Sequence, residues 1–438
     1  MASILMGNLP AFGHLNPTLP LVAELAHCGH SVDYLSTEHF RRAIEAAGAT
    51  LIPIDSPTWF DPRDGRSVLR AIPRLTRSLN RALRQLGPHH DLLAVGGMDP
   101  VVPDLERELN VPVVYLTAVF LQNARTLAHM LRICRDLPAA AGFLMRHRTL
   151  TKALSPILSH TLMGTRVPDL LDMFGPQSST LNIVFTSRDF QPFAGDFDDT
   201  CLFVGPTPTR SLPDPTFPLD RLRDHNGTVV YATLGTVYNR WTHFFRAVVD
   251  AFEGPDTLVV IAAGHPDRVR EIGPVPDNVI LRPFVPQADV LANADLAIAH
   301  GGMGTVSDAV TYGVPLILTP LAADQFFNAY RLEELGIGQV VSKGRFDSAA
   351  VREAATSVLA DHGGRAGMTR LQNSFRTAGG AEAAARAITA ILTSQHRGSE
   401  DPCDGQFRTC SGDAAASVAR RVAHPHPPVR RTRDRRVS

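Results

Sequence analysis

Residues 294–318 read Ala-Asp-Leu-Ala-Ile-Ala-His-Gly-Gly-Met-Gly-Thr-Val-Ser-Asp-Ala-Val-Thr-Tyr-Gly-Val-Pro-Leu-Ile-Leu, and this stretch decides the fold. Two apolar runs of strand length, 295–299 and 314–318, bracket a glycine-rich turn and a segment of helical length. The helix is expected to begin near Thr305 and to stop at Gly313. A strand, a turn, a helix and a second strand in this order indicate a parallel α/β sheet, because parallel strands need a crossover between them.

The turn itself, His300-Gly-Gly-Met-Gly304, has the composition of an anion site. The first backbone N–H groups of a helix have no partner within the helix, and the helix dipole adds a partial positive charge there. Glycines let a phosphate approach the backbone closely. The turn therefore predicts binding of a phosphate-bearing ligand.

The wider stretch from Arg282 to Tyr330 resembles the nucleotide-sugar signature of the UDP-glycosyltransferase superfamily. The resemblance implies that Phe284 stacks on the nucleobase, that His300 and Thr305 contact the diphosphate, and that Asp308 binds the ribose. It also implies that Asp324 and Gln325 bond the sugar. The donor-binding residues expected from the resemblance are Thr233, Gly235, Phe284, Val285, Gln287, His300, Gly302, Gly304, Thr305, Asp308, Asp324 and Gln325. An isolated histidine or aspartate would be better interpreted as a turn residue or helix cap; the ordered set favours the nucleotide site.

Bulk properties limit the other classes of function. The chain has 438 residues, enough for two or three domains, and 43 basic against 43 acidic residues. This balance argues against nucleic acid and membranes as partners. Five scattered cysteines without a Cys-x-x-Cys pair argue against a disulfide framework or zinc site, and no signal peptide or membrane-span-length apolar run is evident. We expect a cytoplasmic protein, monomeric or homodimeric.

The βα pattern appears twice, on either side of a proline-rich stretch. Strand-like runs occur at 3–6, 31–36, 47–54, 91–95, 111–116 and 181–187, and again at 228–234, 257–262 and 279–281. We predict an α/β protein with two Rossmann-like domains facing across a cleft, the GT-B architecture that the resemblance implies. The expected division is 1–204 for the acceptor-binding domain, 205–224 for the linker, 225–380 for the nucleotide-sugar domain, 381–395 for a helix packing back on the first domain, and 396–438 for a disordered Arg-rich tail.

A second motif, residues 7–17, reads Gly-Asn-Leu-Pro-Ala-Phe-Gly-His-Leu-Asn-Pro. It resembles the N-terminal loop of bacterial macrolide-type glycosyltransferases, in which the histidine is the general base. His14 is therefore the catalytic candidate, and an imidazole suits proton removal from a hydroxyl near neutral pH. The alternative is that His14 only packs beside a helix start, where Asn16 is expected to cap and Pro17 to occupy the first turn.

One departure from the family concerns the partner of this histidine. In relatives an aspartate at the end of a later strand hydrogen-bonds the base, and here that position holds Gly96. Asp99 is the nearby candidate for a replacement, although the preferred interpretation of this residue is a cap of a helix that begins at Pro100. The loss of an orienting carboxylate can be severe in other catalytic dyads.

Acceptor recognition is expected in the first half, in the segments 56–84 and 120–160. The candidate residues are Phe12, Trp59, Phe120, Met130 and Phe143, whose apolar side chains suit a bulky hydrophobic molecule such as a macrolide or polyphenol. Helix packing is the competing interpretation for each of them. The partners predicted are thus a nucleotide sugar and a hydrophobic small molecule.

The sequence as a whole predicts an inverting, metal-independent glycosyltransferase that needs no cofactor and moves a hexose from UDP-glucose. Asp324 and Gln325 favour a fully hydroxylated sugar, since a deoxysugar would leave one of them unpaired. Two alternatives stay open: a dTDP-deoxysugar transferase of antibiotic biosynthesis, and a catalytically impaired sugar-nucleotide-binding protein. An epimerase or hydrolase would not need the loop around His14, and Gly-x-Gly-x-x-Gly spacing of a dinucleotide enzyme is absent from it.

Overall fold

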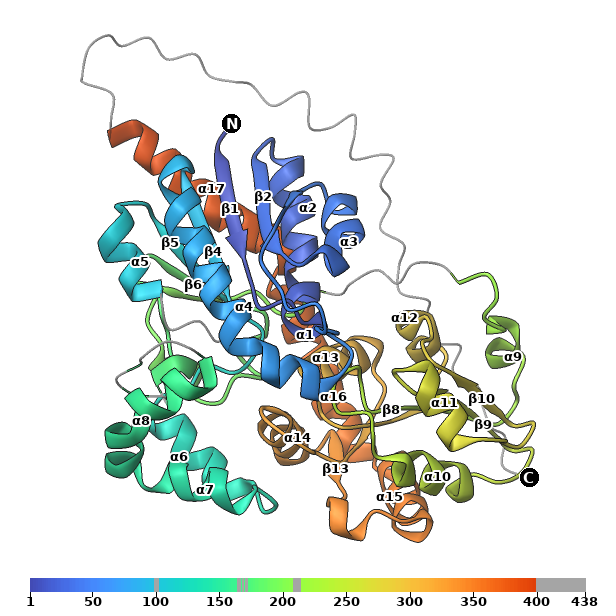
Figure 1. Cartoon of the computed structure of the whole chain (residues 1–438). Helices are drawn as coiled ribbons and strands as arrows, with labels where there is room; N and C mark the ends of the chain where they lie inside the picture. Colours follow the sequence, from blue (N-terminus) through green and yellow to red (C-terminus); the bar gives the residue numbers. More distant parts are fainter. Residues whose placement is uncertain (98–101, 164–166, 168, 170–171, 208–213, 399–438) are drawn as a thin grey trace. The chain divides into compact units, whose positions relative to one another are not determined.

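The computed structural model describes residues 1–97, 102–163, 167, 169, 172–207 and 214–398. It contains two parallel sheets, one in each half of the chain, and helices pack on both faces of each sheet (Figure 1). The predicted class of two α/β domains is confirmed. Asp99 and the segment 399–438 lie outside the described residues.

The first sheet has seven strands in the order β3-β2-β1-β4-β5-β6-β7, with every neighbouring pair parallel. The strands are β1 (Ser3–Gly7), β2 (Ser31–Ser36), β3 (Thr50–Pro53), β4 (Leu92–Gly96), β5 (Val113–Thr117), β6 (Leu181–Val184) and β7 (Cys201–Phe203). The six predicted strands are present, and β7 is additional, because three residues are too few for a periodic signal. The chain reverses its direction of travel across the sheet between β1 and β4. Ligands of such sheets bind at this switch point.

Alternation along β1 shows why the strand forms where it does. Ile4 and Met6 are buried in one core cluster, and Leu5 is buried in another on the opposite face. The helices of this half are α1 (Phe12–Leu15), α2 (Leu19–His27), α3 (Arg41–Ala46), α4 (Gly65–Leu86), α5 (Val102–Leu109), α6 (Ala124–Ile133), α7 (Ala139–Arg146) and α8 (Arg148–Met163). Leu79 of α4 covers the Leu5 face, and Val22 of α2 covers the other.

The second sheet has six strands in the order β10-β9-β8-β11-β12-β13, again all parallel. They are β8 (Thr228–Thr233), β9 (Thr257–Ala262), β10 (Val279–Arg282), β11 (Leu296–Ala299), β12 (Leu316–Leu318) and β13 (Gly338–Val340). Its helices are α9 (Leu219–Arg223), α10 (Thr242–Ala251), α11 (Pro266–Ile272), α12 (Gln287–Leu291), α13 (Met303–Tyr312), α14 (Gln325–Glu334), α15 (Ser348–Ala360), α16 (His362–Thr377) and α17 (Gly380–Gly398). The switch point of this sheet lies between β8 and β11.

Helix α13 begins at Met303, two residues before the predicted start, and ends at Gly313, as predicted. Gly313 has a φ of 69°, a left-handed conformation that glycine adopts without a steric penalty. The helix predicted near 381–393 is α17. It extends from Gly380 to Gly398.

The part of α17 up to Leu392 packs on the first sheet, although it follows the second sheet in sequence (Figure 1). Ala384, Ile388 and Leu392 are buried in the same core cluster as Ile4 of β1 and Leu21 of α2. No helix in the described ranges has both the length and the apolar character needed to span a membrane.

The predicted helix start at Asn16 is wrong. Helical structure begins earlier, with α1 at Phe12, and passes through a 3₁₀ turn, Asn16–Thr18, directly into α2. Asn16 has helical backbone angles and therefore does not act as the cap, whereas Ala11 precedes α1 in an extended conformation. His14 thus lies inside a helical turn, not in the loop before it.

Candidate active site

The two glycine-containing motifs lie at the switch points of the two sheets. His300 directly follows β11, whose last residue, Ala299, pairs with Thr233 at the end of β8. The loop after β8 therefore reaches the imidazole. A Cβ on Gly235 would lie 2.8 Å from Cε1 of His300, so only glycine fits there, and its φ of 68° requires glycine for a second reason.

His300 is buried, and its Nδ1 has no hydrogen-bond partner among the described residues. Burial lowers the pKa of His300 to about 4, so the imidazole is neutral at neutral pH. A neutral imidazole offers one N–H donor and one acceptor nitrogen. Because buried polar atoms are rarely left unpaired, the ring is suited to a ligand that completes its hydrogen bonds.

The start of α13 lies next to this imidazole. Gly302 occupies the N-cap position and provides no side-chain cap, so the first N–H groups of the helix remain for another acceptor. A Cβ on Gly302 would lie 2.6 Å from Nε2 of His300, whereas a Cβ on Gly304 would meet nothing within 4 Å. Thr305 is nearly buried in the same turn. The arrangement can hold an anion close to the backbone.

Asp308 belongs to a short hydrogen-bond network. Nε2 of Gln287 donates to Oδ2 of Asp308 over 2.6 Å, and the hydroxyl of Tyr231 donates to Oε1 of Gln287 over 2.8 Å. Burial raises the pKa of Asp308 to about 6, against the lowering effect of the Gln287 bond. Gln287, predicted to bind the donor, therefore orients Asp308, and the carboxylate keeps acceptor capacity for hydroxyl groups.

Asp324 and Gln325 occupy the start of α14. Asp324 is at the N-cap position but makes no capping bond; its Oδ2 instead accepts from Nδ2 of Asn328 at 2.9 Å. The same Nδ2 donates to the carbonyl of Gly301 at 3.0 Å, next to His300. Oε1 of Gln325 accepts from the N–H groups of Leu321 and Ala322. Asn328 thus links the sugar-binding candidate Asp324 to the turn that is predicted to bind phosphate.

The remaining donor-site candidates differ in exposure. Phe284 is 46% exposed, a position open to a stacking partner, while Val285 is partly buried against the core. Oγ1 of Thr233 donates to the carbonyl of Ala262 and accepts from the N–H of Gly235. Thr233 therefore fixes the shape of the turn through its side chain.

His14 is partly buried on α1, at the switch point of the first sheet. Burial lowers the pKa of His14 to about 4, and its imidazole has no hydrogen-bond partner within the described part of the chain. Its main-chain carbonyl accepts from Nδ2 of Asn8 at 2.9 Å. Within the described part of the chain, hydrogen bonds therefore fix the backbone of His14 but not its imidazole.

Asn8 fills the space beside Gly96, the position at which the family resemblance implies an aspartate. A Cβ on Gly96 would lie 2.7 Å from Nδ2 of Asn8, and one on Gly97 would lie 3.0 Å from its Oδ1. Oδ1 of Asn8 also accepts from the N–H of Leu9 at 2.8 Å. The missing side chain at Gly96 is thus matched by the buried amide of Asn8, the residue that follows β1.

The acceptor candidates fall into two groups. The ring of Phe12 makes edge contacts with His39 and Phe40, and Trp59 and Phe143 are about half exposed. Phe120 and Met130 are buried instead, and Phe120 packs edge-on against Phe190. These two side chains contribute to the core in this conformation, so a contact with an acceptor remains a prediction for both.

Three residues that hold parts of the candidate site in place were not expected from the sequence: Asn8, Tyr231 and Asn328. Asn328 had a detectable signal, because it lies four residues after Asp324 and hence on the same face of a helix. Tyr231 lies two residues before Thr233 on β8, which puts both on one face of the strand. Asn8 has no such signal, since its contact depends on the pairing of β1 with β4.

Comparison with known proteins agrees with this geometry. The family of erythromycin biosynthesis protein CIII-like C-terminal domains matches residues 246–388. A protein described as an uncharacterized UDP-glucosyltransferase, YdhE of Bacillus subtilis (strain 168), is 32% identical over 399 residues, covering 86% of this chain and 95% of its own length. The demethyllactenocin mycarosyltransferase of Streptomyces fradiae is 30% identical over 90% of this chain and 87% of its own length.

A solved structure extends the likeness to the fold. The crystal structure of the calicheamicin glycosyltransferase CalG4 has a TM-score of 0.70 and 30% identity, covering 90% of this chain and 98% of that one. The two parallel sheets, the two glycine-containing motifs and these relatives all support one family assignment. The chain belongs to the bacterial natural-product glycosyltransferases of the UDP-glycosyltransferase superfamily and is a glycosyltransferase with the GT-B fold.

Proposed function

We propose that this glycosyltransferase moves glucose from UDP-glucose to a hydroxyl of a hydrophobic small molecule, with inversion at the anomeric carbon and His14 as general base. The observation that carries the proposal is the placement of His14, a neutral imidazole, at the switch point of the first sheet. Only a neutral imidazole can accept a proton. Its pKa of about 4 keeps it in that form throughout the physiological range.

In the proposed reaction the acceptor oxygen attacks the anomeric carbon as its proton passes to His14. The bond from that carbon to the diphosphate oxygen breaks, and the nucleoside diphosphate leaves with the electron pair. A single displacement turns an α-linked donor into a β-glycoside. Preorganised donors at His300 and the start of α13 would stabilise the developing negative charge.

The other donor-site residues would each bind one part of the donor. Phe284 is exposed for stacking on the base, and Asp308, oriented by Gln287, would accept from the ribose hydroxyls. Asp324, held by Asn328, would accept from hexose hydroxyls, and Gln325 would donate through its Nε2. We propose no metal in this scheme, and we expect unchanged turnover after EDTA treatment; loss of turnover that Mg²⁺ restores would refute this part.

A dTDP-deoxysugar is the second candidate for the donor, since one relative is named a mycarosyltransferase. The Asp324 carboxylate favours the hydroxylated hexose, because Asn328 donates only to its Oδ2 and a missing hydroxyl would leave Oδ1 without that donor.

Mass spectrometry would test the donor directly. The enzyme would be incubated with a mixed macrolide and flavonoid panel and either UDP-glucose or a dTDP-deoxysugar. A mass gain of one hexose with UDP-glucose supports the proposal. A gain only with the dTDP-sugar assigns the second candidate, and UDP binding without any product would favour a non-catalytic role.

A further inference from the structure

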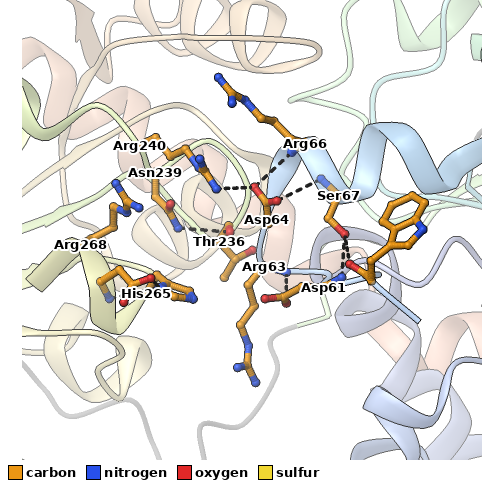
Figure 2. Close-up of polar contacts among 12 residues, drawn as sticks. Asp61, Arg63, Asp64, Arg66, Ser67, Thr236, Asn239, Arg240, His265 and Arg268 are labelled. Atoms are coloured by element: carbon orange, nitrogen blue, oxygen red, sulfur yellow. Dashed lines mark hydrogen bonds and ion pairs between the residues drawn. The ribbon is translucent and has the colours of Figure 1, made fainter. Parts of the chain in front are cut away.

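A segment of the first half, Trp59–Ser67, contacts the loop that follows β8 in the second half. Nη2 of Arg240 lies 3.0 Å from Oδ1 of Asp64, and Figure 2 shows this pair between the two segments. A Cβ on Gly65 would lie 2.7 Å from the carbonyl oxygen of Val237, so the two backbones approach as closely as glycine allows. The loop after β8 contains Gly235, which contacts His300. The Trp59–Ser67 segment is therefore attached to the border of the donor site.

Internal hydrogen bonds give this segment a defined shape. Oγ of Ser67 donates to the carbonyl of Trp59 and accepts from the N–H of Asp61. Asp64 caps α4 by accepting from the N–H groups of Arg66 and Ser67. A segment built in this way holds its side chains in fixed directions at little entropic cost.

Arg63 is the residue that this segment directs to the donor half. Its backbone N–H donates to Asp61, but its guanidinium forms no ion pair in the described part of the chain. In Figure 2 the side chain extends away from the Asp64–Arg240 pair. The guanidinium lies over the ring of Phe284, 5.7 Å from the ring centroid.

The charge of Arg63 also reaches the catalytic side. Burial lowers the pKa of His39; the positive charge of Arg63 lowers it further, and the negative charge of Asp61 raises it. His39 contacts Phe12 on α1, the helix that carries His14. Two other cations of this region are already paired, Arg240 with Asp64 and Arg268 with Glu271, whereas Arg66 is exposed on the same segment. Arg63 thus offers an uncommitted charge between Phe284 and α1.

We propose that Arg63 is a nucleotide-binding residue that stacks on the nucleobase from the side opposite Phe284. The inference rests on the proposed donor site. A guanidinium is planar and stacks on aromatic faces, and it also attracts the diphosphate. A base between the two groups needs about 3.5 Å on each side, roughly 7 Å in total. The flexible Arg63 side chain therefore has to retreat by only about 1–2 Å from its position in the free enzyme.

A structural contact between the halves is the competing explanation for the Arg63–Phe284 pair. In that case the two residues would influence stability and not affinity. The two explanations separate in a double-mutant cycle on binding, because a residue that sandwiches the base loses its effect when the opposite face of the sandwich is removed.

The test is calorimetric titration of the full chain with UDP and with dTDP. Arg63→Ala should weaken binding of the preferred nucleotide by about fivefold or more, and Arg63→Lys should recover only part of it. Arg66→Ala is the matched control, an exposed arginine of the same segment, and should bind as wild type does. In the Phe284→Ala background the effect of Arg63→Ala should largely disappear.

Each other outcome has a definite meaning. If wild type binds and Arg63→Ala binds equally well, the inference is wrong and the proposed donor site stands. An equal loss in Arg63→Ala and Arg66→Ala, or full additivity with Phe284→Ala, also refutes the sandwich. If wild type binds neither nucleotide, the proposed donor site fails and the inference fails with it.

Discussion

At the scale of single residues, the protonation state of His14 decides how the enzyme responds to pH. Its pKa of about 4 lies below the ordinary histidine value of 6.5, so the base stays neutral as the pH falls through 6.5 and is lost only near 4. We expect kcat/KM for the acceptor, at saturating donor, to stay on its plateau between pH 7.5 and about 5.5. An acid limb with an apparent pKa at or above 6.5 would contradict this assignment.

The Asn8–Gly96 pair makes a second residue-scale prediction. Gly96→Asp alone should lower both the melting temperature and kcat, because its Cβ would lie 2.7 Å from Nδ2 of Asn8. Adding Asn8→Gly relieves the clash and places a carboxylate near His14, which should raise the pKa of His14 and move the acid limb upward. The control is Asn8→Gly with Gly96→Asn, which has the same shape without the charge. An equal shift of the acid limb in both double variants would show that the charge at position 96 does not change the pKa of His14.

At the scale of elements, two glycines border the candidate anion site for different reasons: Gly235, in the loop after β8, contacts His300, and Gly304 lies in the first turn of α13. Gly235→Ala should lower the melting temperature and weaken UDP binding, since its Cβ would meet His300 at 2.8 Å and its φ is 68°. A Cβ on Gly304 would meet nothing within 4 Å, so Gly304→Ala should leave the stability of the free enzyme unchanged. The added methyl group should nevertheless weaken UDP binding, because it fills space at the helix start. Thermal melts and UDP titrations check both. If Gly304→Ala binds UDP as tightly as wild type does, the diphosphate does not bind at the start of α13.

The same elements show what the sequence can predict. The strands 31–36 and 257–262 have the predicted bounds: residues 257–262 form a short apolar run, and residues 31–34 alternate polar and apolar side chains. The glycine stop at Gly313 was equally clear. The helical turn around His14 was not, since Asn16 and Pro17 look like a helix start on their own and only tertiary packing extends the helix back to Phe12.

At the scale of the whole molecule, the residues missed by sequence reasoning are those whose contacts join distant segments. Asn8 meets Gly96 because β1 pairs with β4, and Arg63 meets Phe284 although more than two hundred residues separate them. The apolar side chain of Phe120 makes it an acceptor candidate, but its burial against Phe190 depends on the tertiary fold. Local patterns give elements and motifs, whereas such contacts follow only from topology.

The measurement that tests the central claim most directly compares wild type with His14→Ala in sugar transfer and in UDP binding. We predict that transfer, measured by mass spectrometry of the glycosylated acceptor, falls by about 100- to 10,000-fold, as expected for removal of a general base. Binding of UDP, measured by calorimetry, should be unchanged, because the proposed nucleotide site lies on the second sheet. Equal transfer by wild type and His14→Ala would contradict the account, and loss of UDP binding in the variant would place His14 in the donor site instead.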